Sequence, residues 1–287
     1  MQRIMVATDF SERSDRALRR AVLLARAHGA VLDVVHVVDD DRSPRIVEHE
    51  TADARDLLHE LSRTLQKVDG ISSETAVLLA DPFQGIVKAT QDRSPDLLVI
   101  GPHRRQILKD AFVGTTAERT IRSVECPVLM ANGPPVGPYR HIMLTTDFSD
   151  NARNAMQRFL ALSLEPAARH SILHVFDVLA LRMGMSGTLP DEDRNFHITR
   201  QDAASRREMA KFTGGLGKQP MNVTVRYLET TEAAEIHKAA DELGANLIVV
   251  STQGKGAVAR MVLGSVTQQV LQTASVDVLA IPPARSA

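Results

Sequence analysis

Short apolar runs alternate along this chain with longer segments whose apolar residues recur at helical spacing. The short runs are rich in β-branched and aliphatic residues and have the length of strands buried in a parallel sheet. In the first half of the chain they lie at Ile4–Thr8, Leu32–Val37, Ser73–Leu79, Leu97–Ile100 and Val128–Met130. In the second half they lie at Ile142–Thr146, Ser171–Phe176, Asn222–Tyr227, Leu247–Val250 and Val278–Ile281. The alternation predicts an α/β fold in which helices cover both faces of parallel sheets through right-handed crossovers.

Parts of this pattern occur twice, once in each half of the chain. The chain reads RIMVATDFS from Arg3 and HIMLTTDFS from His141, so that Asp9 corresponds to Asp147 at an offset of 138 residues. Later segments, among them DLLVIGPHR in the first half and NLIVVSTQG in the second, correspond at an offset of 150 residues. Repetition over this length predicts a duplicated domain.

The two copies are separated by a stretch rich in proline and glycine, ANGPPVGPY at Ala131–Tyr139. Its three prolines and two glycines are typical of a linker. We therefore expect one domain in residues 1–131, a linker in residues 132–139 and a second domain in residues 140–287. Each domain is predicted to be Rossmann-like, with a five-stranded parallel sheet and helices on both faces.

A candidate phosphate site follows the apolar run Leu247–Val250 of the second copy. A loop that contains Gly254 leads from this run to Gly264 and Ser265, and helical spacing resumes directly afterwards. A glycine beside a hydroxyl at a helix start leaves backbone N–H groups free and places a side-chain donor beside them, and the helix dipole favours an anion there. The alternative is a strand–helix connection whose glycines only permit tight turns.

The spacing of these residues resembles the nucleotide-binding signature of the universal stress protein family, Gly-x-x-Gly-x9-Gly-Ser/Thr. Gly254, nine further residues and Gly264-Ser265 match it, whereas Ser251 stands where the first glycine would be. The resemblance covers nearly the whole chain, once per half, and is to the UspA-like type with two tandem domains. It implies a Rossmann-like fold that binds an adenine nucleotide.

The resemblance also implies which residues of the second copy contact the nucleotide. It places the adenine pocket at the end of the first strand and at the backbone after the second strand. The implied contacts are Thr145, Asp147 and Val175 at base and ribose, Val250, Ser251 and Gly254 along sugar and phosphates, and Gly264, Ser265 and Thr267 at the phosphates.

The aspartates that end the first strand of each copy, Asp9 and Asp147, are expected near the point where the strand order of such a sheet reverses. A carboxylate there can accept hydrogen bonds from a ribose hydroxyl or an adenine amino group. Capping the following helix is the alternative role, although Ser11 and Ser149 follow two residues later and could serve as caps.

The first copy departs from the signature. Gly101, Gly114 and Thr115 keep three of its four positions, but Arg104 replaces the glycine over which the phosphates would lie, and Pro102 removes an N–H donor. The arginine could bind a phosphate or fill the space itself. We expect a weaker or empty site here, with binding mainly through the C-terminal domain. The residues of this weaker site would be Ala7, Asp9, Val37, Gly101, Arg104, Gly114 and Thr115.

Composition and charge narrow the classes of function. A formal net charge of −1 gives no overall attraction to nucleic acid or acidic lipid, and no apolar run reaches membrane-spanning length. The single cysteine, Cys126, excludes an internal disulfide and fits a reducing compartment, so we expect a soluble cytoplasmic protein. Glu125 beside it argues against an activated thiol. The histidines lack paired metal-ligand spacing, so no metal site is predicted, and His36 and His174 are expected to pack or pair locally.

The leading interpretation is a tandem universal stress protein, an adenine-nucleotide-responsive module for stress response and signalling. ATP is the expected ligand, AMP and ADP are alternatives, and the sequence does not indicate a magnesium ion. A slow ATP hydrolase is a second interpretation. However, no general base stands beside Gly254 or Ser265, and the sequence has no phosphate loop of the Gly-x-x-x-x-Gly-Lys type. No catalytic residue is therefore assigned. A nucleotide-free interaction scaffold with degenerate sites is the third. A dehydrogenase is disfavoured because the turn Thr146–Asn151 lacks glycine.

Members of the family commonly pair through the edge of the fifth strand. The resemblance therefore implies that Val128–Met130 and Val278–Ala280 meet at an interface between the halves, where they would cover otherwise open sheet edges. The chain would then form an intramolecular pseudo-dimer. A homodimer of the whole chain is left open as a second form of association.

Overall fold

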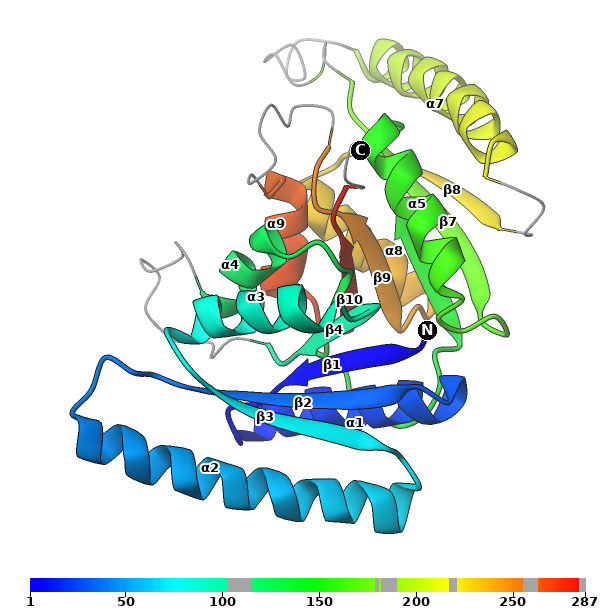
Figure 1. The fold of residues 1–287 in the computed structure, drawn as a ribbon. Helices are drawn as coiled ribbons and strands as arrows, with labels where there is room; N and C mark the ends of the chain where they lie inside the picture. The colour runs from blue at the N-terminus through cyan, green and yellow to red at the C-terminus, as the bar shows by residue number, and fades with distance from the viewer. Residues whose placement is uncertain (103–114, 179–180, 182–189, 217–220, 255–262, 284–287) are drawn as a thin grey trace.

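The strands form one ten-stranded sheet in the computed structural model, which describes residues 1–102, 115–178, 181, 190–216, 221–254 and 263–283 (Figure 1). Their order across the sheet is β3-β2-β1-β4-β5-β10-β9-β6-β7-β8. The strands of the first half are β1 Arg3–Ala7, β2 Val31–Val38, β3 Ser73–Leu79, β4 Leu97–Ile100 and β5 Val128–Met130. Those of the second half are β6 His141–Thr145, β7 Arg169–Phe176, β8 Asn222–Tyr227, β9 Leu247–Ser251 and β10 Asp277–Ile281. Neighbouring strands within each half are parallel, which confirms the predicted Rossmann-like duplication.

Helices cover both faces of the sheet, as Figure 1 shows. One hydrophobic core lies under α1 Glu12–His28, α2 Pro44–Thr64, α5 Asp150–Leu162 and α7 Asp191–Gly214. The other lies under α3 Pro82–Arg93, α4 Thr116–Ser123, α8 Glu232–Leu243 and α9 Ser265–Thr273. A π-helical turn, η1 Leu65–Asp69, extends α2. Within the described residues, no helix combines the length and the apolar character that a membrane span requires.

Burial on both faces explains why the continuous apolar runs form strands. Every residue of β4 and the first four residues of β9 are buried, as expected for central parallel strands between two helical layers.

Local capping residues determine where helix α1 begins and ends. Ser11 Oγ accepts a hydrogen bond from the Ser14 N–H at the start of α1, and Gly29 ends this helix with a left-handed φ of 61°. The predicted strands agree with the observed ones to within two residues at every end.

Antiparallel pairing between β5 and β10 joins the two halves into one sheet. The register sets Val278 opposite Met130, Leu279 opposite Leu129 and Ala280 opposite Val128. Both strands are fully buried. Each strand would otherwise be the open edge of a five-stranded sheet, so this pairing satisfies the backbone groups of both edges. These are the two segments that the resemblance placed at an interface.

The linker is held by a buried polar network around Asp277. Tyr139 Oη donates to Asp277 Oδ2 at 2.6 Å, and the Gly133 N–H donates to Oδ1 at 2.7 Å. Arg20 of α1 forms an ion pair with the same carboxylate at 2.9 Å and stacks on the Tyr139 ring, 4.4 Å from its centroid. Burial raises the pKa of Asp277, although the charge of Arg20 opposes this shift. The network therefore ties a helix of the first half, the linker and a strand of the second half together.

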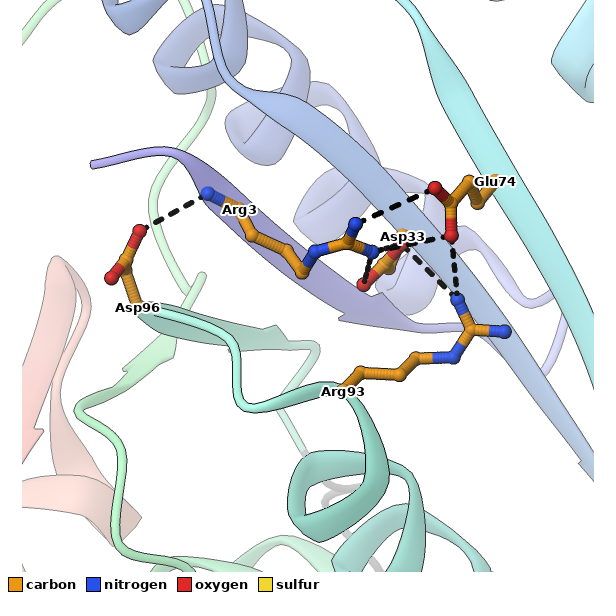
Figure 2. Close-up of polar contacts among 5 residues, drawn as sticks. All are labelled: Arg3, Asp33, Glu74, Arg93 and Asp96. Carbon is orange, nitrogen blue, oxygen red and sulfur yellow. Dashed lines mark hydrogen bonds and ion pairs between the residues drawn. The ribbon is translucent and has the colours of Figure 1, made fainter.

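A charged cluster ties β1, β2 and β3 together at their amino ends (Figure 2). Asp33 of β2 is fully buried, and Arg3 Nη1 lies 2.7 Å and Arg93 Nη1 3.2 Å from its Oδ1. Glu74 of β3 pairs with both arginines at 3.2 Å. Asp96 accepts a hydrogen bond from the Arg3 backbone N–H at 3.1 Å. Two arginines thus neutralise one buried carboxylate.

The second half has a hydrogen-bonded histidine and serine at the positions of Arg3 and Asp33. His141 stands at the position of Arg3 and Ser171 at the position of Asp33, and His141 Nε2 lies 3.0 Å from Ser171 Oγ. The other ring nitrogen of His141 lies 2.9 Å from the Leu243 carbonyl oxygen, and Leu243 corresponds to Arg93. The same backbone arrangement is therefore held by ion pairs in the first half and by hydrogen bonds of His141 in the second.

Replacing Asp33 with asparagine should lower the free energy of unfolding by about 3 kcal/mol, because two arginines lose their buried countercharge. Ser171→Ala at the matching position should cost only about 1 kcal/mol, the value of a neutral hydrogen bond. Urea denaturation followed by far-ultraviolet circular dichroism measures both. Equal and small losses in the two variants would contradict a stabilising role for the charged cluster.

The thiol of Cys126, which precedes β5, should be unreactive in the folded protein. Burial raises its pKa to about 12, so that at pH 8 its thiolate fraction is roughly a thousandfold below that of a thiol with a pKa near 9. We expect Ellman's reagent to modify native protein at least a hundredfold more slowly than urea-unfolded protein. Equal rates for the two samples would contradict this burial.

Candidate functional site

The second half holds a cavity of about 570 Å³ at the carboxyl ends of its strands. It lies where the strand order reverses between β6 and β9, the place at which open α/β sheets bind ligands. The amino ends of α8 and α9, two helices of the layer that also contains α3 and α4, line one side of this cavity. All nine residues that the sequence assigned to the nucleotide site line this cavity, namely Thr145, Asp147, Val175, Val250, Ser251, Gly254, Gly264, Ser265 and Thr267.

Asp147 reaches this cavity from a tight turn after β6. Its Oδ1 accepts hydrogen bonds from the Ser149 N–H at 2.9 Å and from Ser149 Oγ at 2.6 Å. Ser149 Oγ in turn accepts from the Ala152 N–H at 3.1 Å and caps α5, so the alternative role of Asp147 as the helix cap is wrong. A Cβ on Gly254 would lie 2.8 Å from Asp147 Oδ2. The glycine therefore lets the loop after β9 approach the carboxylate closely.

A strained phenylalanine holds the turn that carries Asp147. Phe148 has a φ of 63°, a left-handed value that is rare for a bulky residue. Its ring packs on His174 with centroids 4.0 Å apart, and His174 Nδ1 lies 2.8 Å from the Thr146 carbonyl oxygen. Phe10 of the first copy has a φ of 57° and packs on His36 in the same way. The two histidines pack locally, as predicted, and support the turn.

The amino end of α9 opens into the second-half cavity without a side-chain cap. Gly264 is the N-cap, and no side chain accepts from the first turn of the helix in the described residues. The Ser265 hydroxyl also has no hydrogen-bond partner in the part of the chain that the structure describes, and it lines the cavity. Unpaired N–H groups, the positive end of the helix dipole and a hydroxyl donor therefore face one space.

Three other hydroxyls of the predicted site are already engaged within the protein. Thr267 Oγ1 donates to the Ser251 carbonyl oxygen at 2.7 Å, and Thr145 Oγ1 donates to the Val249 carbonyl oxygen at 3.1 Å. Ser251 Oγ donates to the Gln253 carbonyl oxygen at 2.8 Å and braces the loop that leaves β9. In this conformation these groups can accept hydrogen bonds from a ligand, but their own protons are used.

The sequence analysis missed the contribution of α8. Glu232 and Ile236, one helical turn apart, line the cavity together with Gln268 of α9 and Leu173 of β7. This segment carries none of the signature residues, so no motif in the sequence pointed to Glu232 or Ile236. A residue from α8 enters the site because this helix packs against β7, which depends on the tertiary fold.

The first half holds a smaller cavity, of about 390 Å³, at the matching place. Ala7, Asp9, Val37 and Gly101 line it, as predicted. Thr115 is not among its lining residues, and its Oγ1 accepts from the Glu118 N–H at 3.2 Å and caps α4. The remaining two residues of the predicted weaker site, Arg104 and Gly114, lie outside the described residues.

Two further features distinguish this first cavity. Arg13 lies 3.9 Å from Asp9 Oδ2, whereas the matching position of the second half is Asn151. Burial raises the pKa of Asp9, but hydrogen bonds from Ser11 and Ser14 and the charge of Arg13 outweigh it, and the net pKa lies below the usual value. A Cβ on Gly101 would lie 2.7 Å from the Arg13 carbonyl oxygen, so this signature glycine permits close packing of α1.

The second-half cavity therefore combines an anion-binding helix start, a carboxylate acceptor and apolar walls. This set can bind a ligand that carries a negative group, a hydroxylated middle and an apolar, planar end. In the described residues no group of three or more histidine, cysteine, aspartate or glutamate side chains is placed to hold a metal ion.

Similarity to known proteins agrees with this architecture. A universal stress protein of Mycolicibacterium smegmatis is 22% identical over 297 residues, which cover 98% of this chain and 97% of the relative. A universal stress protein of Methanocaldococcus jannaschii is 29% identical over 144 residues, which cover 46% of this chain and 83% of the relative. The crystal structure of a universal stress protein from Archaeoglobus fulgidus superposes on this chain with a TM-score of 0.70 at 17% sequence identity. The superposition covers 98% of this chain and 96% of that one, so the two proteins share a fold.

The match to a family profile is specific and occurs twice. The profile of the universal stress protein family matches residues 1–132 and again residues 138–282. The two matches together span nearly the whole chain and coincide with the two halves of the ten-stranded sheet. The chain therefore belongs to the universal stress protein family, as a member with two tandem domains.

Proposed function

We propose that this protein binds an adenine nucleotide, ATP in the first place and AMP or ADP as alternatives, in the cavity of its second half. Its role would be that of a nucleotide-responsive module in stress response and signalling. The observation that carries the proposal is the uncapped start of α9, with Ser265 beside it, which opens into the same cavity as the Asp147 carboxylate. Family membership supports this choice of function.

Each part of the nucleotide has a chemical counterpart in the cavity. The phosphates would lie against Gly264 and Ser265, where backbone N–H groups and the helix dipole stabilise negative charge. Asp147 would accept hydrogen bonds from the ribose hydroxyls. The base would lie between Val175 and Ile236, which provide apolar walls. The phosphate charge is met by backbone donors, so the proposal does not require a magnesium ion.

The differences between the halves support binding mainly in the second one. In the first half, Thr115 already caps α4, so a donor of its first turn is engaged. Arg13 lies 3.9 Å from Asp9 Oδ2 in the first half, and the matching position of the second half, 151, is an asparagine. A phosphate at the first cavity would thus gain less from the helix start, and a ribose would compete with Arg13 for the carboxylate.

We assign the cavity a binding role rather than a hydrolytic one. Attack by the Ser265 hydroxyl would need a base within hydrogen-bond reach, and the described residues place none beside it. A signal could instead pass between the halves, because α9 begins at the cavity and its Gln272 donates to Glu118 of α4 at 2.9 Å. The halves would act as an intramolecular pair. Since β5 and β10 cover each other, a homodimer is not needed to protect these edges.

Gly264→Val provides a direct test of phosphate binding. Gly264 has φ −60° and ψ 142°, and a Cβ there would meet its nearest neighbour, the Thr252 carbonyl oxygen, at 3.8 Å, so the fold accommodates the change. The valine side chain would nevertheless occupy the space where backbone must approach phosphate. We expect ATP affinity in calorimetric titration to fall by more than the roughly ten- to hundredfold loss expected for Ser265→Ala, which removes one hydrogen bond to a charged group.

The matched control is Ala117→Val, which adds similar bulk at the first-half cavity. It should leave ATP affinity within about twofold of wild type, and the wild-type stoichiometry should be near one nucleotide per chain. A stoichiometry near two, or loss of binding in Ala117→Val but not in Gly264→Val, would show that the working half is assigned wrongly. A wild-type protein that binds no adenine nucleotide would overturn the proposed function and favour a scaffold.

A further inference from the structure

Glu232 is an acidic side chain that lines the second-half cavity and has no partner among the residues that the structure describes. It is the first residue of α8, half-buried, and lines the cavity. No other described residue forms a hydrogen bond or an ion pair with it. The neighbouring acidic residues differ in this respect, because Glu229 pairs with Lys238 at 3.5 Å and Glu235 with Arg226 at 3.6 Å.

The start of α8 does not need Glu232 as a cap. Thr231 already fills that role, since its Oγ1 accepts from the Ala234 N–H at 3.2 Å. The helix dipole makes the first turn of α8 a favourable place for a negative charge. An ionised carboxylate only accepts hydrogen bonds. Because Glu232 lines the cavity, its carboxylate is available to a donor on a ligand that binds there.

The position of α8 places this acceptor at the base end of the cavity. Ile236 follows one turn later on the same face, and the helix packs on the sheet beside β7, which contributes Leu173 and Val175. The groups suited to phosphate, Gly264 and Ser265, belong instead to the β9–α9 connection. Glu232 thus stands among the apolar residues proposed to hold the base.

The first half lacks this acceptor. Pro82 stands at the position of Glu232 and lines the smaller cavity, and Asp81 before it accepts from the Gln84 N–H at 3.2 Å and caps α3. Proline offers no polar side-chain group. Of the two matching positions, 82 and 232, only position 232 in the second half therefore carries a side chain that can accept a hydrogen bond.

We propose that Glu232 selects the base of the nucleotide by accepting a hydrogen bond from the exocyclic amino group of adenine. The inference rests on the proposed function and adds a specificity-determining residue to it. A purine without an amino group at this edge leaves the carboxylate desolvated and unpaired, which disfavours binding. Selection then comes from an acidic side chain outside the glycine signature.

A thermodynamic cycle tests this pairing. ATP and purine riboside 5′-triphosphate, which lacks only the amino group, are titrated calorimetrically into the full chain, its Glu232→Ala variant and its Glu229→Ala variant. Loss of the amino group should weaken binding to wild type at least tenfold, as expected for a hydrogen bond to a charged acceptor. In Glu232→Ala the two ligands should differ by less than threefold. Glu229→Ala removes an exposed acidic side chain from the preceding turn and should behave like wild type.

Other results would overturn the inference in recognisable ways. An equal penalty for the missing amino group in wild type and Glu232→Ala would mean that another group reads the base. Equal strengthening of both ligands in Glu232→Ala would mean that the carboxylate faces the phosphates. Either result leaves nucleotide binding intact, whereas failure of the wild-type chain to bind ATP at all would remove the proposed function itself.

Discussion

Antiparallel pairing of β5 with β10 is the contact on which the arrangement of both halves depends. Each half alone would expose the backbone groups of its fifth strand along an apolar edge, and joining the edges satisfies these groups and buries the side chains of both strands. The linker reinforces this contact through Asp277, which accepts from Tyr139 and Gly133 and pairs with Arg20 of the first half. Both cavities are thus carried by one continuous sheet.

The duplication makes the two halves an internal comparison, because the same backbone carries different side chains. At the amino ends of the strands, Arg3 and Asp33 form an ion pair, whereas His141 and Ser171 at the matching positions form a hydrogen bond. At the carboxyl ends, Arg13 lies 3.9 Å from Asp9 Oδ2, whereas the second half has an asparagine at the position of Arg13. The proposal that a ligand binds mainly in the second half rests on the uncapped start of α9, because the matching helix start of the first half is capped by Thr115.

The repeated TDFS segment has a structural explanation that is separate from ligand binding. Phe148 adopts a left-handed backbone conformation and is held there by the ring of His174, whose Nδ1 approaches the Thr146 carbonyl oxygen. Ser149 caps the next helix. This turn fixes the direction of Asp147 and places its carboxylate at the carboxyl ends of the strands. Packing of the Phe148 ring on His174 offsets the backbone strain at Phe148.

The sequence by itself determined the strands and the duplication, and its resemblance to a known family named nine residues that line the second-half cavity. Runs such as Leu247–Val250 are apolar on both faces because helices cover both faces of the sheet. A continuous apolar run of this length therefore indicates a buried parallel strand without further information. The nine residues predicted for the second site meet in one cavity because parallel strands end at the same edge of the sheet.

Only the tertiary structure decided how each polar group is used. The hydroxyl of Thr267 could have faced a ligand, yet it donates to the Ser251 carbonyl oxygen, and Thr115 caps α4 rather than lining the first cavity. Glu232 enters the site from a separate helix and belongs to no motif. Hydrogen-bond partners and cavity walls come from residues far apart in the chain, and their choice depends on distances that a local pattern of apolar and polar residues does not contain.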